Sequence, residues 1–198
     1  MLNSKTLQNG LEKLQLPLPL HAQAILLEYL HLLQKWNKTY NLTAITDFDQ
    51  MIAYHLLDSL SIAPYITGDR IVDVGSGAGL PGIPLAVYFP QKQFTLIDSV
   101  GKKTRFMEYV VETLQIKNIQ VVQCRAEEYQ THHCFDIMVA RAVASIEALV
   151  QLSSSLLAPK GKLLMMKSEV VPLAGYRVIP LTVPGVSAKR SLIIKEVM

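Results

Sequence analysis

Hydrophobic positions divide the chain into two parts with different periodicity. Up to about residue 65 they recur every three or four residues, as at Leu26, Leu30 and Leu33, which is the spacing of one face of an α-helix. From Arg70 onward, short apolar runs alternate with segments of helical spacing. The pattern predicts an N-terminal helical cap over residues 1–65 and an α/β region over residues 66–198, joined in one integrated structural domain.

The second part predicts a layered α/β fold. The apolar runs predict strands over 70–74, 94–98, 119–123, 135–140 and 161–167, and helices over 81–89, 101–115 and 145–157. Such alternation produces a mostly parallel sheet with helices on both faces. Two further strands near 176–181 and 191–197, joined by a Pro184-Gly185 turn, predict an antiparallel edge pair and a sheet of seven strands.

One connection is short for this fold. Only residues 168–175 separate the predicted strand at 161–167 from the next one near 176–181, whereas a helical crossover takes roughly a dozen residues. Either the helix is absent here or a flexible stretch is missing from the sequence, and the pattern leaves both readings open.

A glycine-rich turn follows the first predicted strand. The segment 71–82 reads IVDVGSGAGLPG, and Gly75, Gly77 and Gly79 permit a tight turn and a close approach of a ligand to the backbone. Pro81 suits the first turn of the next helix. Asp98 ends the next strand, 23 residues after Gly75, where its carboxylate suits both hydroxyls of a ribose. The pattern predicts a site for an adenosine cofactor.

The spacing of the glycines favours a methyl donor. In the dinucleotide motif G-x-G-x-x-G the third glycine would stand where Leu80 stands here, which weakens an NAD-dependent reading. Asp73 places a carboxylate just upstream, where it suits the ammonium and sulfonium of S-adenosylmethionine. We therefore expect S-adenosylmethionine, with a nicotinamide-dependent oxidoreductase as the weaker alternative.

Other cofactor contacts are expected at the carboxyl ends of the strands, where ligands of open α/β sheets bind. Glu127 suits the adenine amino group and the Ala126 backbone suits the ring, although Glu127 and Glu128 also fit a solvated pair in a loop. Leu80 packs either near the methionine end or in the core. The predicted cofactor-binding residues are Asp73, Gly75, Gly77, Leu80, Asp98, Ala126, Glu127 and Arg141.

Basic side chains gather on the same predicted rim. Lys102 and Lys103 also fit solvated positions at a helix end, and Arg105 lies next to them. The net charge of +3 and pI of about 8.8 permit a polyanionic partner without requiring one. The residues predicted to bind the phosphates of a polyanionic partner such as RNA are Lys102, Lys103, Arg125 and Lys167.

Composition limits the class of protein. With 198 residues, 50% hydrophobic content and a mean hydropathy of +0.26, the chain can bury one sizeable core. It has no apolar run of roughly 20 residues and no signal-peptide layout at its start, so we expect a cytoplasmic protein. Cys124 and Cys134 fit no zinc or redox spacing, and His132-His133 lacks a third ligand. We predict reduced thiols and no metal site.

The residues around Arg141 favour a methyl acceptor that has no proton to lose, so the expected methyl transfer requires no general base. Ala140-Arg141-Ala142 stands where an amine-methylating enzyme of nucleic acids has Asn or Asp followed by Pro-Pro and an aromatic residue, and no Pro-Cys pair is available to attack a pyrimidine. An acceptor with a free lone pair, such as a purine ring nitrogen, is favoured. No general base is assigned; Arg141 and His55 are the nearest candidates, and His55 beside leucines also fits a hydrogen-bonded structural role.

Several motifs together resemble one family. These are WNKTYNLT at 36–43, HLLDS at 55–59, VDVGSGAGLPGIP at 72–84, LIDS at 96–99, GKK at 101–103 and FD at 135–136. Over residues 20–167 the chain resembles the ribosomal small-subunit methyltransferase G family, formerly called glucose-inhibited division protein B.

The resemblance implies a class I, Rossmann-like methyltransferase that moves a methyl group from S-adenosylmethionine to guanine N7 in bacterial 16S ribosomal RNA. It implies cofactor contacts at Gly75, Leu80, Ala126, Glu127 and Arg141, with Asp98 at the ribose. A small-molecule methyltransferase and a non-catalytic RNA-binding protein remain alternatives on the residues alone.

Overall fold

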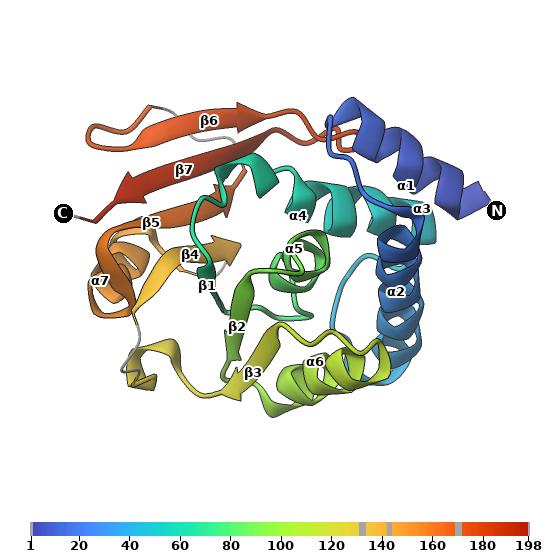
Figure 1. The fold of residues 1–198 in the computed structure, drawn as a ribbon, viewed down its shortest axis with the longest axis horizontal. Helices are drawn as coiled ribbons and strands as arrows, with labels where there is room; N and C mark the ends of the chain where they lie inside the picture. Colours follow the sequence, from blue (N-terminus) through green and yellow to red (C-terminus); the bar gives the residue numbers. More distant parts are fainter. Residues whose placement is uncertain (1, 131–133, 142–143, 169–171, 198) are drawn as a thin grey trace.

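A computed structural model describes the chain except residues 1, 131–133, 142–143, 169–171 and 198. The expectations for His132, His133 and Ala142 therefore lie outside the described residues. The described chain forms a central sheet with one described helix on one face and two helices, together with the N-terminal helices, on the other (Figure 1).

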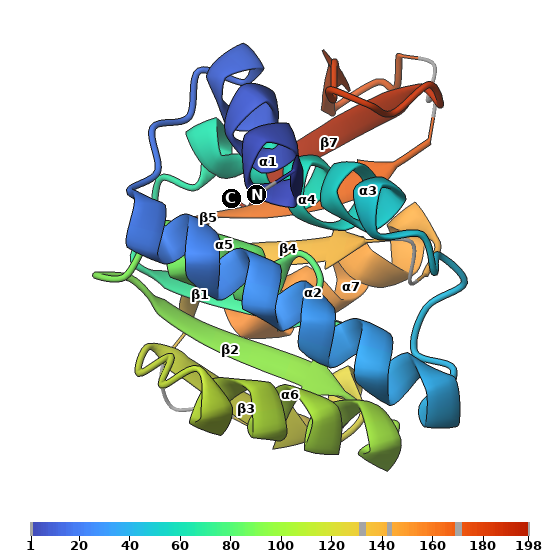
Figure 2. The same cartoon turned by 90° about the vertical axis from the view of Figure 1, so that its right-hand side faces the viewer.

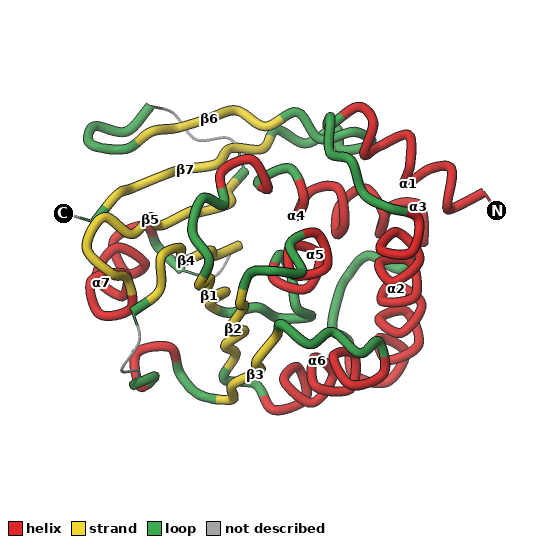
Figure 3. The backbone as a smooth tube through the Cα atoms, viewed as in Figure 1, coloured by secondary structure: helices red, strands yellow, loops and turns green. Residues whose placement is uncertain are grey.

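The sheet has seven strands in the order β3-β2-β1-β4-β5-β7-β6, as the tube in Figure 3 allows the reader to follow. The first five strands pair in parallel, and β7 is antiparallel to both β5 and β6. The prediction of a mostly parallel sheet with an antiparallel edge pair is confirmed. The strands are β1 Arg70–Val74, β2 Gln93–Asp98, β3 Ile119–Gln123, β4 Phe135–Arg141, β5 Leu157–Lys167, β6 Arg177–Leu181 and β7 Arg190–Glu196.

Helices cover both faces of the sheet, as predicted. The helix α7, Ile146–Leu156, lies against one face, and α5, Gly82–Tyr88, and α6, Gly101–Thr113, lie on the other (Figure 1). Between β3 and β4 the described residues contain only the 3-10 turn η3, Ala126–Glu128.

The N-terminal region forms a helical cap, and α2 runs beside α5 and α6 (Figure 2). One hydrophobic cluster contains Leu26 and Leu56 of the cap together with Ile83 of α5 and Phe106 of α6. The cap therefore shares a core with the sheet layer. Its elements are α1 Leu2–Lys13, α2 Leu20–Tyr40, α3 Phe48–Met51, the π-helix η1 Ile52–Leu57, α4 Asp58–Leu60 and the 3-10 turn η2 Ala63–Tyr65.

The short connection after β5 crosses to a parallel strand. Because β5 and β6 are both antiparallel to β7, they are parallel to each other. Of the connection, residues 168 and 172–176 are described, and they form no helix. The Pro184-Gly185 turn between β6 and β7 is confirmed, with Gly185 at φ +79° and Val186 N donating to Val183 O at 3.1 Å.

Some predicted boundaries were wrong by a few residues. The strand predicted at 161–167 begins at Leu157, directly after α7. Apolar residues continue across Leu156 and Leu157, so hydrophobicity does not mark where the backbone changes from helical to extended. The helix predicted from 81 begins at Gly82, because Pro81 serves as its N-cap, and the helix predicted to 115 ends at Thr113.

Candidate active site

The glycine turn after β1 has the conformation that its sequence predicts. Gly75, Gly77 and Gly79 have φ values of +67°, +62° and +89°, a region that side chains with a Cβ rarely adopt. The turn is joined to the next strand, since Gly75 N donates to Ile97 O at 2.8 Å. Backbone geometry at the carboxyl end of β1 therefore requires these glycines.

Asp73 lies beneath this turn and is fully buried. Its Oδ2 accepts a hydrogen bond from Gly82 N at 2.8 Å, and a Cβ on Gly82 would lie 2.7 Å from the same oxygen. Within the described part of the chain Oδ1 has no hydrogen-bond partner. Burial raises the pKa of Asp73 to about 7, against the opposing effects of the Gly82 hydrogen bond and of Arg141. A buried acceptor without a partner suits a ligand donor or cation.

Asp98 lies at the end of β2 and contacts the glycine turn, the residue before α6 and a lysine of α6. Its Oδ1 accepts from Val100 N at 2.9 Å, and its Oδ2 accepts from Gly77 N at 2.9 Å. Lys103 Nζ lies 3.5 Å from Oδ2. Each carboxylate oxygen can accept further bonds, so these contacts orient Asp98 and leave it able to bind hydroxyl groups.

A cavity of about 490 Å³ opens at this edge of the sheet. Seven of the residues predicted to bind cofactor or RNA line it: Gly75, Asp98, Lys103, Arg125, Ala126, Glu127 and Arg141. Asp73, Gly77 and Leu80 do not line it. Leu80 is only 4% exposed and belongs to the hydrophobic core, which is one of the two places considered for it.

Part of the cavity wall was missed from the sequence. Val100, just before α6, and Leu149 and Leu152 of α7 supply apolar surface. The helical spacing of Leu149 and Leu152 predicts that they are buried, but does not show that they face a ligand. The cavity thus combines an apolar wall with acidic and backbone groups, the usual composition of a cofactor site.

A second cavity of about 410 Å³ lies where the cap meets the sheet edge. Arg141 lines both cavities. The remaining lining residues come from the cap and from the last strands: Ile45, Tyr54, His55, Asp58, Met166, Lys167, Ser168 and Arg190. The cap therefore folds over the carboxyl edge of the sheet.

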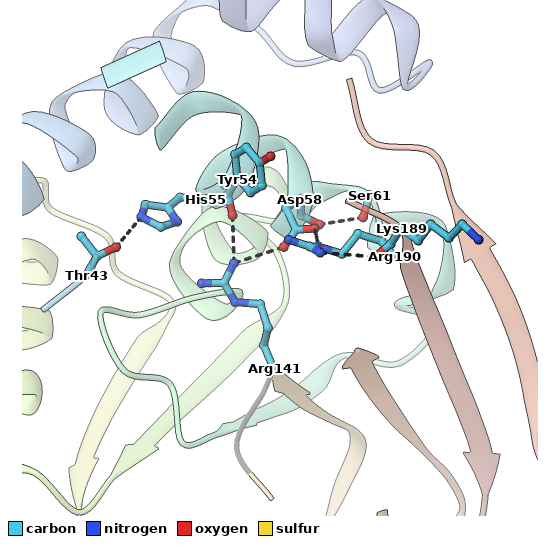
Figure 4. A network of polar contacts seen from close by, with 8 residues as sticks. All are labelled: Thr43, Tyr54, His55, Asp58, Ser61, Arg141, Lys189 and Arg190. Atoms are coloured by element: carbon cyan, nitrogen blue, oxygen red, sulfur yellow. Dashed lines mark hydrogen bonds and ion pairs between the residues drawn. The ribbon is translucent and has the colours of Figure 1, made fainter. Parts of the chain in front are cut away.

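Arg141 joins the sheet to the cap. Its Nη1 donates to Tyr54 O at 3.1 Å and to Asp58 Oδ2 at 3.2 Å. Arg190 Nε donates to the other oxygen of Asp58 at 3.0 Å, as Figure 4 shows. Neither Asp58 nor Arg190 was predicted as a site residue.

His55 is buried and is held by a hydroxyl. Its Nε2 lies 2.9 Å from Thr43 Oγ1, and Nδ1 has no partner among the described residues. Burial, followed by the nearby Arg141 charge, lowers the pKa of His55 to about 4. The ring is therefore neutral near pH 7.

The predicted basic residues occupy different surroundings. Lys102 Nζ donates to Tyr40 O at 2.8 Å, and Lys167 Nζ donates to Ala144 O at 2.6 Å. Arg125 is exposed at the rim of the first cavity. Tyr40 also packs on Trp36, four residues earlier on α2, with ring centroids 5.2 Å apart, the spacing that brings two side chains together on a helix.

None of the described helices has the length and apolarity needed to cross a membrane. No group of three His, Cys, Asp or Glu side chains in this part of the chain is placed to hold a metal ion.

The strand order, the glycine turn after β1 and the acid at the end of β2 define the Rossmann-like fold of the class I methyltransferases. Two solved structures share this fold. Precorrin-6y C5,15-methyltransferase from Geobacter metallireducens is 13% identical, with a TM-score of 0.52 over 69% of this chain and 85% of that one. TYW2 of M. jannaschii, solved in complex with AdoMet, is also 13% identical, with a TM-score of 0.56 over 71% and 74%.

Sequence comparison gives the family. The family model described as rRNA small subunit methyltransferase G matches residues 22–172. The chain is 49% identical to ribosomal RNA small subunit methyltransferase G of Hydrogenovibrio crunogenus, covering 85% of this chain and 82% of the relative. It is 44% identical to the protein of that name from Coxiella burnetii, over 96% of both chains. The chain belongs to the rRNA small subunit methyltransferase G family, so the resemblance inferred from its motifs is confirmed.

Proposed function

We propose that this chain transfers a methyl group from S-adenosylmethionine to N7 of a guanine in bacterial 16S ribosomal RNA, in the cytoplasm. The observation that carries the proposal is the family membership, which extends along 96% of the chain in the Coxiella burnetii relative. The two cavities that share Arg141 support it, because methyl transfer requires a donor and an acceptor held side by side.

The first cavity fits the cofactor, which when bound supplies an electrophilic methyl group on a sulfonium. Asp98 is oriented by Gly77 N and Val100 N and would hold the ribose hydroxyls. Ala126 and Glu127 line the same cavity and would contact the adenine ring and its amino group. Gly75 lines the cavity and would approach the methionine part through its backbone. Asp73 is buried beneath the same turn and does not line the cavity, so its carboxylate would act on the positive charge of the methionine part from behind the turn.

The acceptor nitrogen needs positioning more than proton transfer. Guanine N7 has an in-plane lone pair and no proton to lose, so holding it in line with the methyl group accounts for catalysis. His55 is neutral and engaged by the Thr43 hydroxyl, which fits a structural role. The Arg141 guanidinium has only donor groups, and it donates to Tyr54 O and Asp58 Oδ2, so it is not placed to accept a proton.

Cations around both cavities would bind the RNA backbone. Lys167 lines the second cavity and Arg125 the rim of the first, so each can meet phosphates on either side of the acceptor. Lys103 contacts Asp98 and is shared with the cofactor site, whereas Lys102 lies farther out beside Tyr40. Because the methylated purine is cationic, these charges serve phosphates and not the reacting ring.

Calorimetry with S-adenosylhomocysteine, followed by methyl transfer onto undermethylated small ribosomal subunits, tests the proposal. We expect binding of the cofactor product and transfer to the RNA. A small-molecule methyltransferase would bind the cofactor product but would not show RNA affinity that falls steeply with salt. Binding of NAD without S-adenosylhomocysteine would indicate an oxidoreductase, and RNA binding without either cofactor would indicate a non-catalytic protein.

A further inference from the structure

One buried carboxylate connects the two cavities through two arginines. Asp58 has a side chain that is 3% exposed, and its oxygens lie 3.2 Å from Arg141 Nη1 and 3.0 Å from Arg190 Nε. Figure 4 shows the two guanidinium groups approaching Asp58 from different strands. Both arginine side chains are 22% exposed, so each can contact a ligand in a cavity while buried Asp58 fixes its orientation.

Tyr54, four residues before Asp58, also contacts both arginines. Tyr54 accepts from Arg141 through its carbonyl at 3.1 Å, and its ring lies 5.8 Å from Arg190 Cζ. Tyr54 belongs to the π-helix Ile52–Leu57 that directly precedes Asp58. Single π-helical turns occur frequently at functional sites. The segment 54–58 thus contacts both arginines with side-chain and main-chain groups.

Stability alone does not account for this cluster. A buried ion pair is often no more stabilising than apolar residues of similar volume, because its desolvation offsets its attraction. Here one carboxylate faces two guanidiniums, so the cluster keeps a net positive charge beside the second cavity. Such a charge suits an anionic ligand, and the planar fork of an arginine matches the geometry of a phosphate.

We propose that Asp58 is a positioning residue for methyl transfer. It holds Arg141 in the wall shared by the two cavities and presents the guanidinium of Arg190 to a phosphate of the acceptor RNA strand. This inference rests on the proposed function. Fixing an arginine before its ligand arrives reduces the side-chain entropy lost on binding, so Asp58 acts on RNA affinity through Arg190.

The test is a double-mutant cycle on the KM for small ribosomal subunits in methyl transfer. Asp58→Asn and Arg190→Ala are each expected to raise this KM about tenfold, whereas the double variant should exceed Arg190→Ala by less than about twofold, because contacting residues act through one interaction. The calorimetric Kd for S-adenosylhomocysteine should change less than about threefold in Asp58→Asn, since the Tyr54 carbonyl still holds Arg141.

Asp136→Asn is the matched control. Asp136 pairs with Arg70 Nη2 at 3.1 Å, at the amino ends of β4 and β1 and away from both cavities. It also accepts from Asp69 N and Arg70 N. This variant should lower the Tm and leave the KM unchanged, which separates a positioning role from general destabilisation.

If the rise in KM of the double variant equals the product of the two single rises, Asp58 and Arg190 act independently and the inference is overturned. An unchanged KM in Asp58→Asn would also overturn it. If Asp58→Asn does not fold, Arg190→Lys tests the inference instead. The lysine ammonium keeps the positive charge but lacks the planar, paired donors of the guanidinium. A several-fold rise in KM would support the inference, and an unchanged KM would overturn it. Failure of the wild type to methylate RNA would instead overturn the proposed function, and this inference with it.

Discussion

The two cavities at the carboxyl edge are assembled in different ways. The first takes most of its polar groups from three successive segments, the glycine turn after β1, Asp98 at the end of β2 and the segment after β3, while Arg141 and the apolar face of α7 complete it. The second joins the cap to three distant strands, and Asp58 and Arg190 are 132 residues apart. Local segments therefore specify the expected donor site, whereas tertiary packing of the cap forms the expected acceptor site.

This difference predicts separable functions. Changes in the expected cofactor contacts of the first cavity, Asp98, Ala126 and Glu127, should weaken cofactor binding and spare RNA binding, and changes in the second cavity should do the reverse. Arg141 lines both cavities, so its replacement should affect both ligands.

Asp98→Ala should give the largest difference between the loss of cofactor affinity and the loss of RNA affinity. Loss of the carboxylate removes the expected ribose contacts and frees Gly77 N and Val100 N, which it now fixes. Hydrogen bonds to charged groups contribute about 1.5–3 kcal/mol each, so the affinity for S-adenosylhomocysteine should fall about 100-fold. Calorimetry measures this loss, and binding of an RNA fragment by the same protein is the control. Equal loss of both affinities would break the proposed separation.

The buried acid under the glycine turn predicts a pH effect on stability. Asp73 has its pKa raised by burial to about 7 in the folded state, so the folded protein binds this proton more tightly than the unfolded chain does. Its contribution to stability is present at low pH and is lost as pH rises from about 4 to about 7. The slope should approach about 1.4 kcal/mol per pH unit for this group.

Denaturant unfolding of the wild type and of Asp73→Asn between pH 5 and 8 measures that contribution. The amide does not titrate, so the variant should gain stability relative to the wild type as pH rises toward 7, and the difference should then stay constant. A difference independent of pH would mean that Asp73 is ionised throughout.

In the second cavity, Lys167→Ala should act on RNA alone. Removing one phosphate contact should weaken RNA binding several-fold and reduce the slope of log K against log salt by about 1. Affinity for S-adenosylhomocysteine should not change, because Lys167 does not line the first cavity. Lys195→Ala, at a half-buried position of β7 outside both cavities, is a charge-matched comparison expected to leave the methyl-transfer KM unchanged.

The smallest effect is expected at His55. Glutamine can keep a hydrogen bond to Thr43 Oγ1, and the histidine is neutral with a pKa lowered to about 4. His55→Gln should therefore change kcat less than about threefold, well below the 10²–10⁴-fold contribution of a general acid or base. If turnover were abolished with folding and both binding affinities intact, the base-free mechanism would be wrong.

The sequence predicted the sheet and the first cavity because their signals are local. Apolar runs identified the strands, and positive φ at Gly75, Gly77 and Gly79 follows from the glycine pattern. It did not distinguish residues that line the cavity from those beneath it, as Leu80 and Asp73 show. Facing a ligand depends on side-chain packing, which the spacing of glycines does not encode.

The second cavity was mostly missed for a related reason. Asp58 lies in the HLLDS motif at 55–59, which contributed to the family resemblance, but its two arginine partners follow only from how the cap packs on the sheet. Arg190 lies outside the motifs that carried the resemblance. Such pairings need the tertiary fold, whereas Arg141 was found because it follows a predicted strand.

Methyl transfer from labelled S-adenosylmethionine to undermethylated small ribosomal subunits tests the central claim most directly, with digestion of the RNA to locate the label. The account predicts label in 7-methylguanine from 16S ribosomal RNA. Label on another atom or another RNA, or binding of S-adenosylhomocysteine without any transfer to RNA, would contradict it.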